Sequence, residues 1–134
     1  MGAKQYEIGD AELEILKILW DSGAVTVRDV LGQLHEAGRH VAYTTVQTLL
    51  TRLEQKGYVR SDKSDFAFVY RAKLTRNRVT QSRLKTLVRE LYDGAAGPLV
   101  LQLVRSEQLT ADEIAELQKL VDRLDTESVG KPTL

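Results

Sequence analysis

The side chains best suited to binding an anion lie on one face of a helix predicted over residues 43–56. Its apolar residues recur at helical spacing: Val46, Leu49, Leu50 and Leu53. The opposite side carries hydroxyls, amides and one guanidinium: Thr44, Thr48, Thr51, Gln55, Gln47 and Arg52. Glu54, the sole carboxylate of this helix, lies nearer the apolar side. Because a solvated helix face usually mixes glutamate with lysine, this pattern favours contact with phosphates and base edges.

The elements that would position this face are three helices followed by a hairpin. The helices are expected at residues 10–20, 26–38 and 43–56. Asp10 is the expected N-cap of the first helix, and Thr26 with Asp29 forms a capping box for the second. Extended segments at residues 58–60 and 66–71, separated by a polar turn, indicate a two-stranded hairpin. This order is that of a winged helix-turn-helix domain, whose third helix enters the major groove of DNA.

The predicted DNA contacts divide by their chemistry. Thr44, Thr45 and Thr48 lie near the helix N-terminus, where free N–H groups and the helix dipole favour a phosphate. Gln47 can form two hydrogen bonds with adenine, and Arg52 most simply meets a phosphate. Cations of the hairpin would add further phosphate contacts. The full predicted set is Arg39, His40, Tyr43, Thr44, Thr45, Gln47, Thr48, Thr51, Arg52, Arg60 and Lys63.

Three more helices are predicted after residue 74, and their apolar stripes suit a subunit interface. The first ends at Asp93-Gly94, a loop covers residues 95–98, a short helix spans residues 99–104, and Thr110 with Glu113 caps the last. The expected interface residues are Leu84, Leu87, Val88, Leu91, Leu99, Val100, Leu103, Ile114, Leu117, Val121 and Leu124. About 60 residues cannot bury these stripes alone, so we expect them to pack across a twofold axis. An effector pocket between the same helices is the alternative.

The predicted fold class is mainly α with a small β-hairpin. We expect a winged-helix DNA-binding domain at residues 1–73, a three-helix dimerisation region at residues 74–125 and a disordered tail at residues 126–134. The charge distribution adds a second basic segment at residues 71–89, with seven basic residues and no acidic one. We expect it to be a solvated face or to form interdomain salt bridges with acidic helices, in preference to DNA contact.

Composition narrows the function classes. The 134 residues include no cysteine and two histidines, so we expect no metal, no cofactor and no enzymatic activity. Acidic and basic residues balance at 19 each, which argues against indiscriminate coating of nucleic acid. No apolar run reaches the roughly 20 residues of a membrane span, and residues 1–10 lack a signal-peptide pattern. A cytoplasmic location is therefore expected.

Short sequence blocks in a fixed order extend through most of the chain. They are Asp10-Ala11-Glu12, Ile15-Leu16-Lys17-Ile18-Leu19-Trp20, Thr45-Val46-Gln47-Thr48-Leu49-Leu50-Thr51-Arg52-Leu53, Lys56-Gly57, Phe68-Val69-Tyr70, Leu91-Tyr92-Asp93-Gly94 and Leu99-Val100-Leu101. Together they resemble the penicillinase-repressor family of bacterial regulators (BlaI/MecI/CopY). The resemblance implies a homodimeric repressor that binds operator DNA through an N-terminal winged helix and controls β-lactamase or related resistance genes.

The resemblance also implies how repression ends. In similar members a membrane-bound sensor protease triggers cleavage of an Asn-Phe bond in the short helix after the Pro98 region, and Gln102-Leu103 stands at the equivalent position here. Copper-responsive members bind metal through paired cysteines, which this chain lacks. Two rival classes remain open: a winged-helix repressor switched by a small molecule near the dimer interface, and a winged helix that binds proteins and has no salt-dependent DNA affinity.

Overall fold

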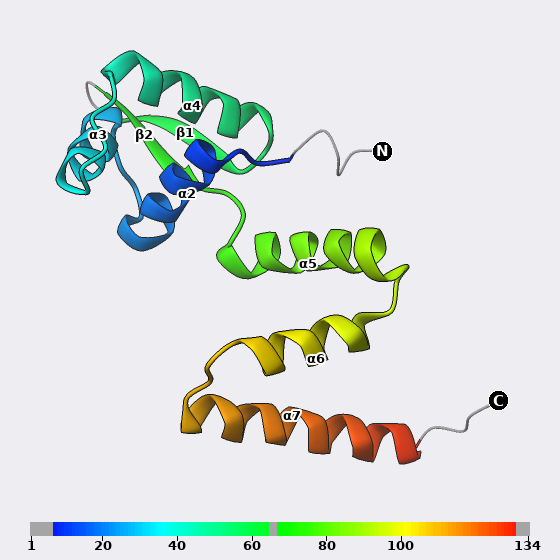
Figure 1. The fold of residues 1–134 in the computed structure, drawn as a ribbon. Coiled ribbons are helices and arrows are strands. Elements are labelled where there is room, and N and C mark those ends of the chain that lie inside the picture. The colour runs from blue at the N-terminus through cyan, green and yellow to red at the C-terminus, as the bar shows by residue number, and fades with distance from the viewer. Residues whose placement is uncertain (1–6, 65–66, 131–134) are drawn as a thin grey trace. The chain divides into compact units, whose positions relative to one another are not determined.

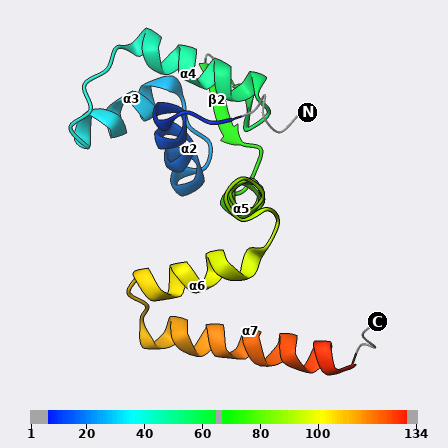
Figure 2. The same ribbon diagram turned by 45° about the vertical axis from the view of Figure 1, so that its right-hand side comes forward.

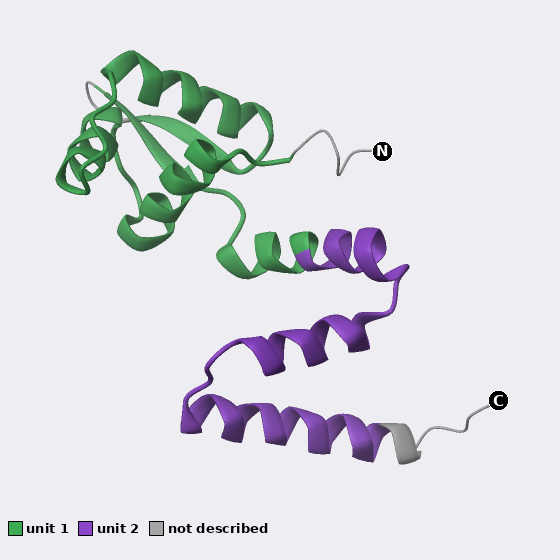
Figure 3. Cartoon of the chain, viewed as in Figure 1, with its two compact units in different colours: residues 1–83 green, residues 84–134 purple. Residues whose placement is uncertain are grey.

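The computed structural model describes residues 7–64 and 67–130 and confirms the predicted fold class, mainly helical with one β-hairpin. In chain order the elements are α2 (Asp10–Ser22), α3 (Val27–Glu36), α4 (Tyr43–Gln55), β1 (Val59–Ser64), β2 (Ala67–Ala72), α5 (Arg76–Tyr92), α6 (Ala96–Ser106) and α7 (Ala111–Gly130) (Figure 1). They form two compact units, unit 1 at residues 1–83 and unit 2 at residues 84–134 (Figure 3). The boundary falls inside α5, which differs from the expected boundary after residue 73.

Unit 1 encloses one hydrophobic core between α2, α3, α4 and the hairpin. The largest fully buried side chains come from all of these elements: Ile15, Leu16, Leu19, Val30, Val46, Leu50, Leu53 and Val59. The N-terminal part of α5 joins this core through Val79, which is also buried. Burying such side chains is the main force that orients each helix, because each contributes roughly 1.5–3 kcal/mol when fully removed from water. The apolar stripe of α4 therefore fixes its opposite face toward the outside.

The helix α2 begins one residue earlier than predicted. Gly9, not Asp10, is the N-cap of α2, and the Glu12 carboxylate accepts a hydrogen bond of 2.8 Å from the Gly9 N–H. Asp10 is therefore the first helical residue, and the Glu12 carboxylate satisfies the N–H group of the N-cap residue Gly9. The capping box predicted for the second helix is confirmed, since Thr26 and Asp29 exchange hydrogen bonds at 3.0 and 3.1 Å.

The hairpin is longer and more regular than the sequence indicated. Residues 61–64, expected in a turn, belong to β1, and the antiparallel register pairs Val59 with Ala72 and Ser64 with Ala67. Residues 65–66, where the second strand was expected to begin, lie outside the described residues. Tyr70 exchanges two backbone hydrogen bonds with Val25, at 2.7 and 3.0 Å, so the hairpin is also anchored to the loop before α3.

Unit 2 contains the rest of α5 and helices α6 and α7, which Figure 2 shows as successive helices joined by a short connection. The prediction of a loop at residues 95–98 is wrong in part, because α6 starts at Ala96. Pro98 lies in the first turn of α6, where the N–H that proline lacks would have no partner within the helix. The irregular tail expected from Thr126 is likewise not found up to Gly130, where α7 ends. Residues 131–134 lie outside the described part of the chain. None of the described helices is long and apolar enough to cross a bilayer.

Candidate nucleic-acid interface

The outward face of α4 is the candidate site. Val46, Leu50 and Leu53 are completely buried, whereas the side chains on the other side are exposed: Tyr43, Thr44, Thr45, Gln47, Thr48, Thr51, Arg52 and Gln55. The sequence-predicted contacts within this helix are therefore brought together on one surface. The Thr51 hydroxyl donates to the Gln47 carbonyl at 2.9 Å, which holds its oxygen on the helix surface with a lone pair available.

The face of α4 is free of competing negative charge because its single carboxylate is engaged elsewhere. Glu54 Oε2 accepts hydrogen bonds from the Ser61 backbone N–H at 3.1 Å and from the Ser61 hydroxyl at 2.8 Å. This pair also ties the C-terminal turn of α4 to β1. The two hydrogen bonds direct this carboxylate toward β1.

A glycine cap ends α4. Gly57 takes a φ of 88°, its N–H donates to the Glu54 carbonyl at 3.0 Å, and the Tyr58 N–H donates to the Leu53 carbonyl at 2.9 Å. This is the pattern of a Schellman cap, which needs a residue that accepts a positive φ. The cap turns the chain directly from α4 into β1 and so sets the position of the hairpin relative to the helix.

The N-terminal end of α4 gathers cationic and aromatic groups, one of which the sequence did not indicate. The Arg28 guanidinium of α3 lies 5.7 Å from the centre of the Tyr43 ring, a cation–π contact. The His35 and His40 rings stand 5.2 Å apart. Arg39, predicted as a DNA contact, is half exposed and forms an ion pair of 2.9 Å with Glu14.

The two cations predicted for the wing lie on opposite faces of the hairpin. Side chains alternate along a strand, and directly paired residues share a face. Lys63 therefore shares a face with Ser61, which hydrogen-bonds to α4, whereas Arg60 projects from the other face together with its partner Arg71. Lys63 and Arg60 are both exposed, but only Lys63 lies on the side of the hairpin that faces α4.

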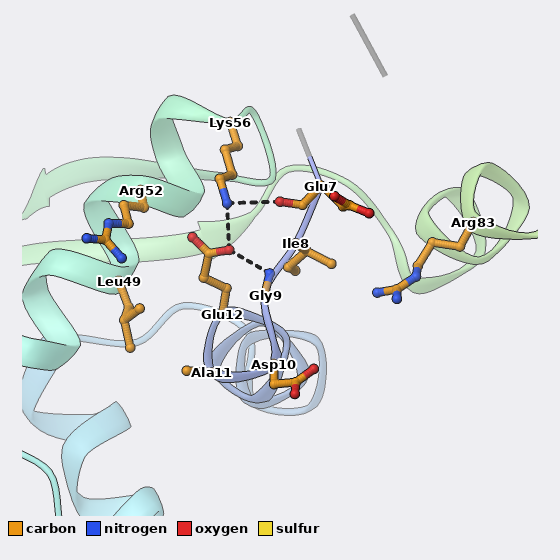
Figure 4. Close-up of a pocket in the computed structure, with 10 residues that line it drawn as sticks. All are labelled: Glu7, Ile8, Gly9, Asp10, Ala11, Glu12, Leu49, Arg52, Lys56 and Arg83. Carbon is orange, nitrogen blue, oxygen red and sulfur yellow. Dashed lines mark hydrogen bonds and ion pairs between the residues drawn. The ribbon is translucent and has the colours of Figure 1, made fainter. Parts of the chain in front are cut away.

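Below the C-terminal half of α4 lies a pocket of about 650 Å³ with a partly buried ion pair in its wall (Figure 4). Lys56 Nζ donates to Glu12 Oε1 at 2.7 Å and to the Glu7 carbonyl at 2.9 Å, so the segment before α2 is fastened to the end of α4. Burial raises the pKa of Glu12, but the Gly9 N–H and the Lys56 ammonium outweigh it, and the pKa lies below its ordinary value.

Two arginines of the pocket lining remain outside that ion pair. Arg52 reaches the pocket from α4 and Arg83 reaches it from α5, and the ion pairs found among the described residues include neither of them. Arg52 thus belongs both to the edge of the outer α4 face and to the rim of this hollow. Its charge is available to an external anion.

Comparison with known proteins gives a consistent assignment. Residues 8–123 match the sequence profile of the family described as penicillinase repressor. The methicillin resistance regulatory protein MecI of Mammaliicoccus sciuri is 29% identical over 123 residues, covering 92% of this chain and 99% of that protein. The penicillinase repressor of Bacillus licheniformis is 28% identical over 116 residues, with coverage of 87% and 90%.

Among solved structures, the solution structure of the DNA-binding domain of the repressor BlaI is 30% identical. It matches with a TM-score of 0.48 over 54% of this chain and 87% of that chain. The profile match covers both units of this chain, from the segment before α2 into α7. The chain therefore belongs to the penicillinase repressor family, whose members are winged-helix DNA-binding transcriptional repressors and not enzymes.

Proposed function

We propose that this chain acts as a homodimer that binds a palindromic operator with two α4 helices, one in each major-groove half-site. The observation that carries the proposal is the outer face of α4: eight exposed side chains rich in hydroxyls and amides, with the one carboxylate of the helix held by Ser61. Such a face offers hydrogen bonds to bases and phosphates and presents no like charge to repel them.

The roles of the side chains follow from their place on the helix. Thr44 and Thr45 lie in the first turn, where their hydroxyls and the positive end of the helix dipole would bind a phosphate. Gln47 and Thr48 follow on the exposed side, where Gln47 can read adenine through two hydrogen bonds. Arg52 and Lys63 supply phosphate contacts at the two margins of the face.

Pairing of two copies is supported by unit 2, whose apolar side chains have no core of their own. Between residues 84 and 127 no side chain is buried. Eight of the predicted interface residues are exposed: Leu84, Leu87, Leu91, Val100, Leu103, Ile114, Val121 and Leu124. Leu91 and Leu124 are the most exposed of them, at 65% and 64%. A second copy related by a twofold axis would cover them.

The target genes are inferred from the relatives. The similar proteins are named for methicillin resistance and for penicillinase control, which supports a β-lactamase or related resistance gene as the target of this repressor. Relief of repression is proposed at the Gln102-Leu103 bond, which lies inside α6 with both side chains exposed. A membrane-bound sensor protease would start this cleavage.

The cleavage step has a direct test in cells that carry the cognate sensor. Exposure to a β-lactam is expected to convert the 134-residue chain into a fragment ending at Gln102, detected by intact-mass spectrometry. A Gln102→Pro, Leu103→Pro double variant serves as the uncleavable control. If the repressor stays intact while its target gene is induced, the protease mechanism is refuted. The proposal of DNA binding does not depend on this result.

The test of the DNA-binding face begins with the genomic fragments that the full-length protein enriches, which supply the operator. Gln47→Ala is expected to alter sequence preference at a single base pair of each half-site, by about 1–3 kcal/mol of discrimination. Arg52→Ala is expected to weaken binding to all sequences alike and to lower the salt slope by about one. Equal losses on every operator variant for both substitutions would contradict the assigned roles.

A further inference from the structure

The surface of unit 1 exposes few large apolar side chains, and both of those found among its described residues are aromatic. Tyr43 is 42% exposed and Phe68 is 54% exposed, whereas the other large apolar side chains of this unit are buried or packed against its core. Tyr43 opens α4. Phe68 lies on β2, close to the end of the hairpin.

The register of the hairpin fixes the face from which Phe68 projects. Phe68 pairs directly with Lys63, and Tyr70 pairs with Ser61. Since paired residues share a face and alternate residues along a strand do too, all four side chains lie on the same side of the hairpin. Ser61 donates to Glu54 of α4, so this is the side toward α4.

Tyr70, on the same face, is buried in the core of unit 1. Burial raises the pKa of its phenol, and the charges of Glu54 and Tyr43 add to this rise. Phe68 is the next residue along the same face and projects beyond the core, where its ring is left in water.

We propose that Phe68 is a second, apolar DNA contact, which packs against the deoxyribose walls of the minor groove next to the major groove occupied by α4. The proposal rests on the function proposed above. Lys63, opposite Phe68, would bind a phosphate at the edge of the same groove. Proteins that bind the minor groove frequently place apolar side chains such as phenylalanine there.

Charge around the ring favours DNA over a protein partner. On the side toward α4, Glu54 is occupied by Ser61, and Lys63 is exposed beside the ring. Asp62 projects from the opposite face and pairs with Arg71 at 3.6 Å. The described strand residues of the Phe68 face include no carboxylate. An exposed aromatic ring next to an exposed cation on such a face fits a polyanion with apolar sugar surfaces.

The test compares Phe68→Ala with Lys63→Ala in full-length protein on the operator, across a range of salt concentrations. Phe68→Ala is expected to lower affinity about tenfold at every salt concentration with an unchanged salt slope, because the lost contact is apolar. Lys63→Ala is expected to lower the slope by about one. Arg71→Ala, on the opposite face of the hairpin and outside the predicted set of DNA contacts, is the matched control and is expected to change neither quantity.

A fluorescent reporter keeps the inference testable if Phe68→Ala fails to fold. In the Phe68→Trp variant, the added indole is expected to change its emission on operator binding, relative to wild type with Trp20 alone. The role of Phe68 would be overturned if the wild-type protein binds the operator and Phe68→Ala binds it with unchanged affinity. It would also be overturned if the emission of Phe68→Trp does not change on binding. Absence of salt-dependent binding by the wild-type protein would instead overturn the proposed function.

Discussion

At the scale of single residues, Glu12 carries the most consequential charge in unit 1. Its carboxylate is buried and receives hydrogen bonds from the Gly9 N–H and from Lys56 Nζ, so a single oxygen both starts α2 and holds the end of α4. A buried carboxylate is stable only when such partners replace water. This ion pair therefore adds to the apolar core in holding the C-terminal end of α4.

We predict that Glu12→Gln lowers the free energy of unfolding by about 2 kcal/mol at neutral pH, because Lys56 is left without its partner in a poorly solvated place. The pKa of Glu12 is lowered in the folded state, so its stabilisation is complete above the unfolded pKa and is lost as the pH falls through the folded pKa. The difference between wild type and variant should thus shrink below about pH 4.5. Urea unfolding at pH 7 and pH 3 measures it.

Glu14 offers the matched control for this experiment. It pairs with Arg39 at 2.9 Å, but both side chains are partly exposed to solvent. Exposed ion pairs contribute little, so Glu14→Gln is expected to change stability by less than about 1 kcal/mol at either pH. A loss as large as that of Glu12→Gln would show that burial is not the source of the effect.

At the scale of elements, two glycines in unit 1 should respond to alanine in opposite directions. Gly57 ends α4 at a φ of 88°, with open space where an added methyl group would project, so Gly57→Ala is expected to cost about 1–2 kcal/mol from backbone strain alone. Gly32 lies inside α3, also in open space and without positive φ, so Gly32→Ala should stabilise by about 0.5–1 kcal/mol. Thermal unfolding of both variants gives the signs, and matching signs would contradict the account.

The elements themselves could be read from the sequence with good accuracy, because apolar spacing and glycine positions determine them locally. The Thr26 cap and the end of α4 at Gly57 are examples. The start of α2 was predicted one residue too late, because Asp10 is a preferred N-cap residue, whereas the observed N-cap, Gly9, has no capping side chain. The start of α6 was predicted too late because proline is common in loops, although the first turn of a helix accepts Pro98 equally well.

The sequence predicted which residues of the candidate site share a helix face, but not the contacts between different elements. Helical periodicity placed Thr44, Gln47 and Thr48 on one exposed face. Periodicity within one helix cannot report how helices pack, so the contact between the Arg28 guanidinium and the Tyr43 ring could not be predicted. The faces of the two wing cations depend on the strand register, which local sequence patterns do not determine.

At the scale of the whole molecule, the apolar side chains of α7 provide the test of pairing. Val121→Asp would place a charge in the proposed seam with Ile114 and Leu124, and we expect the dimer dissociation constant to rise by at least about thirtyfold. Sedimentation equilibrium measures this change. Affinity for the full palindrome should fall in parallel, while affinity for an isolated half-site is retained.

Lys119 supplies the control on the same helix. It is separated from Val121 by about 200° around the axis and is exposed, so Lys119→Asp should leave the association state unchanged. A wild-type protein that sediments as a monomer at all concentrations would contradict the pairing of two copies, whatever the behaviour of the variants.

The clamp between Glu54 and Ser61 has a consequence for how an operator is read. Because two hydrogen bonds join α4 to its neighbouring strand, we expect the two elements to move together when they meet the duplex. The nucleic acid must supply the local flexibility that the protein lacks. Base steps that are touched by neither element, but lie between them, would then contribute to selectivity through the ease with which they deform.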